Sequence, residues 1–155
     1  MTRLAAAALA AVVAPAPASP PAVVAVEPAR VQLAPGESVE VALSFSIAKG
    51  FRIQANPASR PFLVPALLEL EGNGQVGVGK PVYPPGKDYR LAGDDDNLSV
   101  YEEKFLVRLP VTAGADALAG ETTLTGRLRY QACNERVCLR PTSVPVAVRV
   151  TLRRD

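Results

Sequence analysis

Histidine is absent from the 155-residue sequence. Its absence excludes Ser-His-Asp and Cys-His catalysis, together with zinc sites that use imidazole ligands. The two cysteines are too few for a four-thiolate zinc site within one chain. Tryptophan is also absent, and aromatic residues make up only 5% of the chain. Valine, leucine and alanine must therefore build most of any hydrophobic core.

The sequence has no strong excess of either charge. Its formal net charge is +2, and basic and acidic residues are interspersed without a basic block. A protein that binds nucleic acid or an anionic membrane surface usually carries a basic patch. The charge pattern therefore favours neither a nucleic-acid partner nor a membrane-surface role.

Long hydrophobic runs are lacking as well. The apolar run from Leu4 to Val13 is too short to span a bilayer as a helix, so we expect no direct membrane insertion. Arg3 precedes this run and Ala16-Pro17-Ala18 follows it, which is the pattern of a cleaved signal peptide over residues 1–18. An Ala/Pro-rich tail is the alternative. With a signal peptide, the protein would be periplasmic or otherwise exported, soluble after cleavage, in a compartment where disulfides persist.

The rest of the chain is expected to form one domain. Residues 19–28 are rich in proline and alanine and are predicted to be a linker, and residues 29–155 are predicted to be a β-domain. Apolar and polar residues alternate with the period of a strand in several segments. These segments are 38–47, 51–55, 68–70, 105–111, 122–132 and 144–152.

The turns support an all-β fold. Ala34-Pro35-Gly36-Glu37 has the residues of a type II turn and is predicted to join Val31 and Leu33 to the strand at 38–47 as a hairpin. No segment has a convincing helical period, and 15 prolines and 11 glycines punctuate the short strands. The fold class predicted is an immunoglobulin-like antiparallel β-sandwich.

Two short motifs point only weakly to ligands. Gly72–Gly77 matches G-x-G-x-x-G, but Pro81 follows closely and argues against the helix that a nucleotide site needs. A loop is the better interpretation. The carboxylate cluster Asp94–Asn97 would offer oxygen ligands to calcium, but it lacks EF-hand spacing, so a solvated loop is favoured here too.

Cys133 and Cys138 form the most informative motif. Strand-like segments flank them on both sides, which places the pair at the tip of a hairpin, within disulfide reach. A structural staple is one interpretation, although closing a loop of about six residues contributes only about 2 kcal/mol in the chain-entropy model. Thiol-disulfide exchange is the other, because a partner thiolate needs in-line access to one sulfur. Arg136 and Arg140 would lower a thiol pKa if they lay beside it, or they are solvated surface residues.

Several motifs together resemble a known family. Tyr130-Gln131-Ala132-Cys133, four residues, then Cys138-Leu139-Arg140-Pro141 is similar to the redox hairpin of the N-terminal periplasmic domain of DsbD, the thiol:disulfide interchange protein. The resemblance covers residues 24–152. Further segments agree with the family pattern in the same order: Gly50–Pro57, Phe62–Pro65, Tyr83–Lys87 and Val100–Glu102.

The resemblance implies an immunoglobulin-like fold and a function in electron transfer. In this family, the domain passes electrons to thioredoxin-like periplasmic proteins, to disulfide isomerases and to cytochrome c maturation thioredoxins. The resemblance also implies that Cys138 forms the mixed disulfide with a partner and that Cys133 resolves it. No metal, flavin or nucleotide cofactor is implied. A membrane thiol-electron transporter would act as the donor in trans. The alternative function is a non-enzymatic β-sandwich interaction module with an inert disulfide.

The sequence departs from the family pattern at two places. Arg52 stands where the family often has histidine. The segment 89–97 ends in carboxylates, whereas the cap loop of the family carries phenylalanine or tyrosine.

The N-terminal pattern makes a direct prediction. Export should remove residues 1–18, because Arg3, the apolar run and Ala16-Pro17-Ala18 together form a signal-peptidase substrate. N-terminal sequencing of the exported protein should begin near Ser19. Recovery of the chain with Met1 intact from the cytoplasm of an export-competent host would contradict this.

Overall fold

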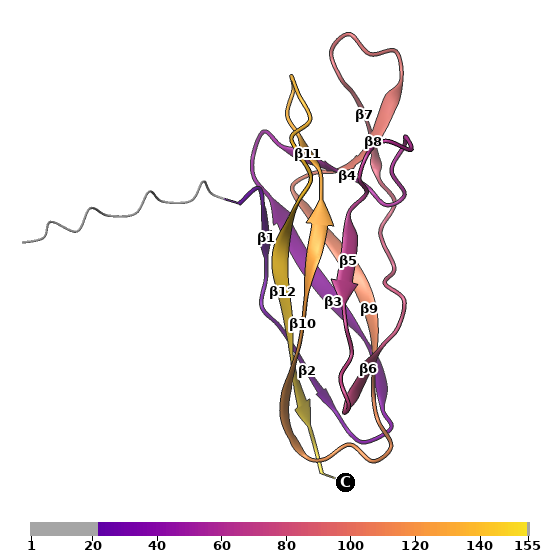
Figure 1. Ribbon diagram of the computed structural model, residues 1–155, viewed down its shortest axis with the longest axis vertical. Coiled ribbons are helices and arrows are strands. Elements are labelled where there is room, and N and C mark those ends of the chain that lie inside the picture. The colour runs from indigo at the N-terminus through magenta and orange to yellow at the C-terminus, as the bar shows by residue number, and fades with distance from the viewer. Residues whose placement is uncertain (1–21, 155) are drawn as a thin grey trace, which may run out of the picture.

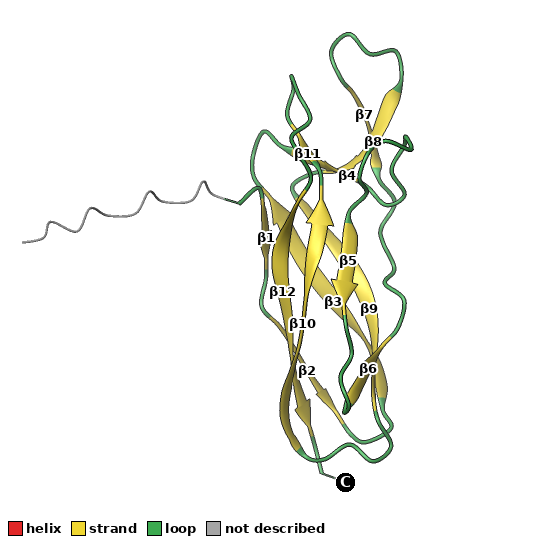
Figure 2. Ribbon diagram, in the orientation of Figure 1, coloured by secondary structure: helices red, strands yellow, loops and turns green. Residues whose placement is uncertain are grey.

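Residues 22–154 are described by the computed structural model, and the predicted signal peptide lies outside them (Figure 1). Within this range the chain forms twelve strands and no helix (Figure 2). Consequently, no helix in the described range is long and apolar enough to cross a membrane. The all-β fold confirms the class predicted from the alternating segments.

Two four-stranded sheets form the body of the molecule. The first has the order β1 (Val24–Val26), β3 (Ser38–Ile47), β9 (Lys104–Ala113) and β6 (Val76–Val78). The second has the order β2 (Ala29–Leu33), β12 (Thr142–Leu152), β10 (Gly120–Tyr130) and β5 (Leu67–Leu70). Their pairs are antiparallel, except that β2 runs parallel to β12.

The core lies between these sheets and follows the period of two. Leu43, Phe45 and Val107 from the first sheet and Leu128 and Val148 from the second are fully buried in one cluster. The ring of Phe105 stacks between Phe45 and Tyr101, at centroid distances of 5.1 and 4.6 Å. Each large side chain buried in this way contributes about 1.5–3 kcal/mol to the free energy of folding.

A third sheet closes one end of the sandwich and is called the end sheet below. Its order is β11 (Ala132–Cys133), β4 (Arg52–Gln54), β8 (Asn97–Tyr101) and β7 (Lys87–Arg90). The hairpin after β11 and the β7–β8 loop both project from this end, opposite the C-terminal end of the molecule (Figure 1).

Two details of the fold correct the sequence analysis. The turn at 34–37 forms as predicted, with the N–H of Glu37 donating to Ala34 O (3.0 Å) and Gly36 at a φ of 77°. However, β2 does not pair with β3: it pairs with β12, because the turn carries the chain from one sheet to the other. In addition, β1 lies inside the predicted linker 19–28, because its valines pair with β3 and bury Val24 in the core.

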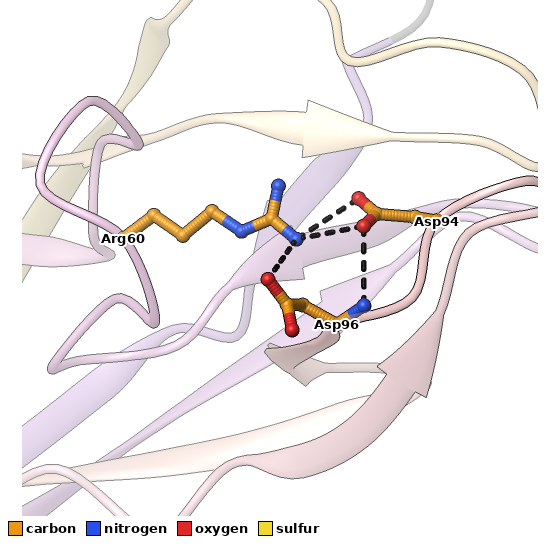
Figure 3. A network of polar contacts seen from close by, with 3 residues as sticks. All are labelled: Arg60, Asp94 and Asp96. Carbon is orange, nitrogen blue, oxygen red and sulfur yellow. Dashed lines mark hydrogen bonds and ion pairs between the residues drawn. The ribbon is translucent and has the colours of Figure 1, made fainter.

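A small second cluster attaches the β7–β8 hairpin to the body. Leu63 in the β4–β5 connection packs against Leu98 and Val100 of β8, with Tyr89 and Leu91 beside them. Asp94 lies in the loop of this hairpin, and Arg60 lies in the β4–β5 connection. One guanidinium nitrogen of Arg60 is 3.0 and 2.9 Å from the two carboxylate oxygens of Asp94 (Figure 3). These contacts hold the loop to the β4–β5 connection.

The same contacts affect the titration of Asp94. The backbone N–H of Asp96 and the side chain of Arg60 donate hydrogen bonds to this carboxylate and lower its pKa. Because the folded pKa lies below the unfolded one, the contact stabilises the loop above the ordinary Asp pKa. That stabilisation is lost as the pH falls through the folded pKa.

We therefore expect Arg60→Ala to raise the pKa of Asp94 toward its ordinary value, without restoring it fully, because the Asp96 N–H remains. Carboxyl-carbon NMR titration measures this directly. Arg90→Ala is the control, because Arg90 lies on the same hairpin and forms no ion pair with any residue from 22 to 154. An Asp94 pKa that is the same in Arg60→Ala as in the wild type would show that Arg60 does not hold the loop.

Candidate active site

The cysteine hairpin extends from the longest strand pair of the molecule. Strands β10 and β12 pair from Gly120↔Leu152 to Tyr130↔Thr142. Beyond them, Leu139 N donates to Ala132 O (2.7 Å) and Asn134 N donates to Val137 O (3.0 Å). This ladder sets the two cysteines directly opposite each other.

Cys133 and Cys138 form a disulfide whose Cα atoms are 4.0 Å apart. Its two sulfurs belong to residues of very different accessibility. Cys133 is 1% exposed, because β11 lies against β4 with Cys133 opposite Arg52. Cys138 is partly exposed, and its neighbours Val137 and Leu139 are 51% and 39% exposed. An attacking thiolate from solvent would therefore meet Cys138 first.

Gln131 anchors the base of the hairpin. Its Oε1 accepts a hydrogen bond from Val64 N (2.9 Å), and its Nε2 donates to Leu139 O (3.2 Å). Its backbone carbonyl accepts from the N–H of Gln54 (3.1 Å). One residue thus joins both arms of the hairpin to β4 and to the β4–β5 connection.

The buried side of the disulfide meets a polar side chain. Gln54 is fully buried at the end of β4, and its Nε2 lies 3.2 Å from Cys133 Sγ as a hydrogen-bond donor. Its Oε1 has no hydrogen-bond partner among residues 22–154. The sulfur of Cys133 is therefore the only polar side-chain atom in the described chain with which this amide is hydrogen-bonded.

Arg52 lies opposite the same cysteine in the end sheet. The guanidinium of Arg52 lies over the ring of Tyr89, 3.9 Å from its centroid, and its Nε is 3.2 Å from Glu102 Oε2. Side chains directly opposite in a sheet have Cβ atoms about 4.5–5.5 Å apart, so Arg52 and Cys133 are neighbours. The charged end of Arg52 is thus engaged by Tyr89 and Glu102.

Tyr101 connects the end sheet to the core. Its hydroxyl donates to Pro84 O (2.7 Å) and accepts from Asn56 N (3.2 Å), while its ring stacks on Phe105. Burial raises the pKa of this tyrosine. The end sheet, on which Cys133 lies, is therefore packed directly against the core of the sandwich.

The remaining residues singled out in the sequence lie elsewhere. Arg136 and Arg140 are exposed, with no ion pair to any part of the chain that the structure describes. Asp94 binds Arg60, and no group of three or more His, Cys, Asp or Glu side chains in the described range is arranged to hold a metal ion. The segment Gly72–Gly77 runs into β6 and not into a helix.

Two residues of the site were missed in the sequence analysis. Arg52 was noted only as a departure from the family pattern, and Gln54 only as part of a matching segment. Strand alternation places both on one face of β4. Only the pairing of β4 with β11, about eighty residues further along the chain, shows that this face meets Cys133.

Solved structures offer remote likenesses. The N-terminal periplasmic domain of ScsB from Proteus mirabilis is 15% identical with a TM-score of 0.49. The match covers 80% of this chain but only 43% of that structure. PapD-like domain 7 of human CEP192 is 10% identical with a TM-score of 0.38, over 95% of this chain and 98% of that domain. Both likenesses are too distant to carry information on function.

Sequence comparison is more informative. A search of curated proteins finds no match. The family model of the N-terminal part of the thiol:disulfide interchange protein DsbD matches residues 21–149. That range contains both cysteines, Arg52 and Gln54. The chain therefore belongs to the family of the DsbD N-terminal domain.

Proposed function

We propose that this domain carries out thiol-disulfide exchange outside the cytoplasm and passes electrons to disulfide-bonded clients or thioredoxin-like proteins. The observation that carries the proposal is the unequal exposure of the two cysteines: Cys133 is 1% exposed, whereas Cys138 is partly exposed at the tip of a hairpin. Exchange requires one sulfur that a partner can reach and a second one held ready to complete the reaction.

Reduction of a client disulfide proceeds in two thiol-disulfide exchange steps. The thiolate of reduced Cys138 attacks one sulfur of a client disulfide, and the other client sulfur leaves as a thiolate. A mixed disulfide between Cys138 and the client results. The thiolate of Cys133 then attacks Cys138 Sγ, re-forms the intramolecular disulfide and releases the second client thiolate. The client gains two electrons and the domain loses two.

The surroundings of the hairpin suit this sequence of steps. The tip presents Val137 and Leu139 as exposed apolar side chains beside Cys138, which a partner would cover on docking. The base is fixed by Gln131 and by β4, so Cys133 stays opposite Cys138. Exchange therefore needs little rearrangement of the fold.

The electron donor is proposed to act in trans. After each turnover, a dithiol must reduce the Cys133–Cys138 disulfide again. A membrane thiol-electron transporter is the class of donor that the family resemblance implies, and disulfide isomerases and thioredoxin-like proteins are the corresponding acceptors. The exchange chemistry requires no metal, flavin or nucleotide.

The first prediction separates exchange from a structural staple. Reduction should leave the domain folded, because the closed loop is short and contributes about 2 kcal/mol. Its ends are also held by the eleven-residue pairing of β10 with β12. Thermal unfolding with and without reductant should differ by about 10 °C or less. The Cys133→Ala/Cys138→Ala variant should match the reduced protein. Unfolding upon reduction would favour an inert staple.

The second prediction assigns roles to the two sulfurs. Cys133→Ala should accumulate more mixed disulfide with an oxidised thioredoxin-like partner than the wild type does, because the domain then has no second thiolate with which to complete the exchange. Cys138→Ala should accumulate little, because Cys133 is buried. Non-reducing gels measure both, and the double variant shows the background. Accumulation only in Cys138→Ala would reverse the assignment.

A further inference from the structure

In the oxidised protein, the side-chain amide of Gln54 uses its donor but not its acceptor. Its Nε2 donates to Cys133 Sγ at 3.2 Å, and its Oε1 is buried with no hydrogen-bond partner anywhere in 22–154. A buried carbonyl without a partner costs free energy, and a disulfide sulfur is only a weak acceptor. Folding of the oxidised state alone would be served as well by an apolar side chain of the same size.

The reduced protein uses the same amide more fully. A Cys133 thiolate is a strong, charged acceptor for the N–H of Nε2, and a hydrogen bond to a charged group is stronger than one to a neutral group. A Cys133 thiol can instead donate its S–H to Oε1. Glutamine offers both a donor and an acceptor, so it matches Cys133 in either protonation state.

We propose that Gln54 is a catalytic residue that stabilises the thiolate of Cys133 when this sulfur leaves the disulfide. When a donor re-reduces the domain, its thiolate attacks Cys138 Sγ and the S–S bond breaks. Cys133 then leaves with the electron pair, directly against Nε2 of Gln54. A leaving thiolate of lower pKa departs faster. When the domain reduces a client, the same contact keeps Cys133 ionised for its attack on the mixed disulfide.

The position of Gln54 suits this role better than that of any charged residue nearby. The side chain is fully buried, so water does not compete for its N–H groups. Its backbone N–H is bonded to Gln131 O (3.1 Å), which fixes β4 against the hairpin. Arg52 lies on the same face, but its guanidinium is held by Tyr89 and Glu102.

The test compares Gln54→Met with the wild type. Methionine fills a similar volume without a donor. The rate of disulfide reduction by dithiothreitol should fall on the order of three- to tenfold. In a Cys138→Ala background, where Cys133 is the single thiol, Gln54→Met should raise the pKa of the Cys133 thiol, measured by the ultraviolet absorbance of the thiolate. Gln75→Met is the matched control, because Gln75 precedes β6 and accepts from Leu118 N (2.7 Å). It should reduce at the wild-type rate.

The outcomes separate this inference from the proposed function on which it rests. If the wild-type disulfide resists dithiothreitol in the folded protein, the exchange function itself is contradicted. If the wild type is reduced readily and Gln54→Met has the same rate and the same Cys133 pKa, only the role of Gln54 is overturned.

A second measurement covers the case in which Gln54→Met does not fold. In the Cys138→Ala protein with Gln54 intact, the side-chain NH₂ signals of Gln54 in a ¹⁵N-resolved NMR spectrum should shift in step with the ionisation of Cys133. Signals that do not move over that titration would overturn the inference.

Discussion

The pairing of β11 with β4 is the contact on which the site depends. It involves two residue pairs, Ala132↔Ile53 and Cys133↔Arg52, and it seats one cysteine of the hairpin on the end sheet while the other remains at the tip. A hairpin with both cysteines free of the sheet would expose both sulfurs alike. The chemical difference between Cys133 and Cys138 is thus a consequence of this short strand pair.

The sandwich provides the rigidity that this pairing needs. Strands β10 and β12 hold the arms of the hairpin, and Tyr101 ties the end sheet to the stacked rings of the core. Gln131 joins the hairpin base to the β4–β5 connection. Cys133 is therefore held between β4 and the opposite arm of the hairpin.

The strands predicted most fully from the sequence are those with long apolar alternation. Strands β3, β9, β10 and β12 have it, whereas their registers are known only from the structure. Strand β7, with the sequence Lys-Asp-Tyr-Arg, has no such pattern, because its side chains are mostly solvent-exposed at the edge of the end sheet. The pairing of β2 was predicted wrongly, because a turn fixes the direction of the chain locally but not the sheet that it enters.

The site could be predicted only in part, because local sequence patterns do not show which strands pair. The C-x4-C spacing and the flanking strands indicate a disulfide at a hairpin tip, and the structure contains it. The contact between Gln54 and Cys133 joins residues far apart in sequence, through a strand pair of two residues that no periodicity indicates. Short-range patterns therefore identify the two cysteines, whereas their environment depends on long-range pairing.

The central claim is that Cys138 is the sulfur open to attack and Cys133 the one that leaves. Brief reaction of the oxidised wild-type protein with glutathione, followed by acid quenching and peptide mass spectrometry, locates the first covalent adduct. The structure predicts glutathione on Cys138, with Cys133 recovered as the free thiol. An adduct mainly on Cys133 would contradict the account.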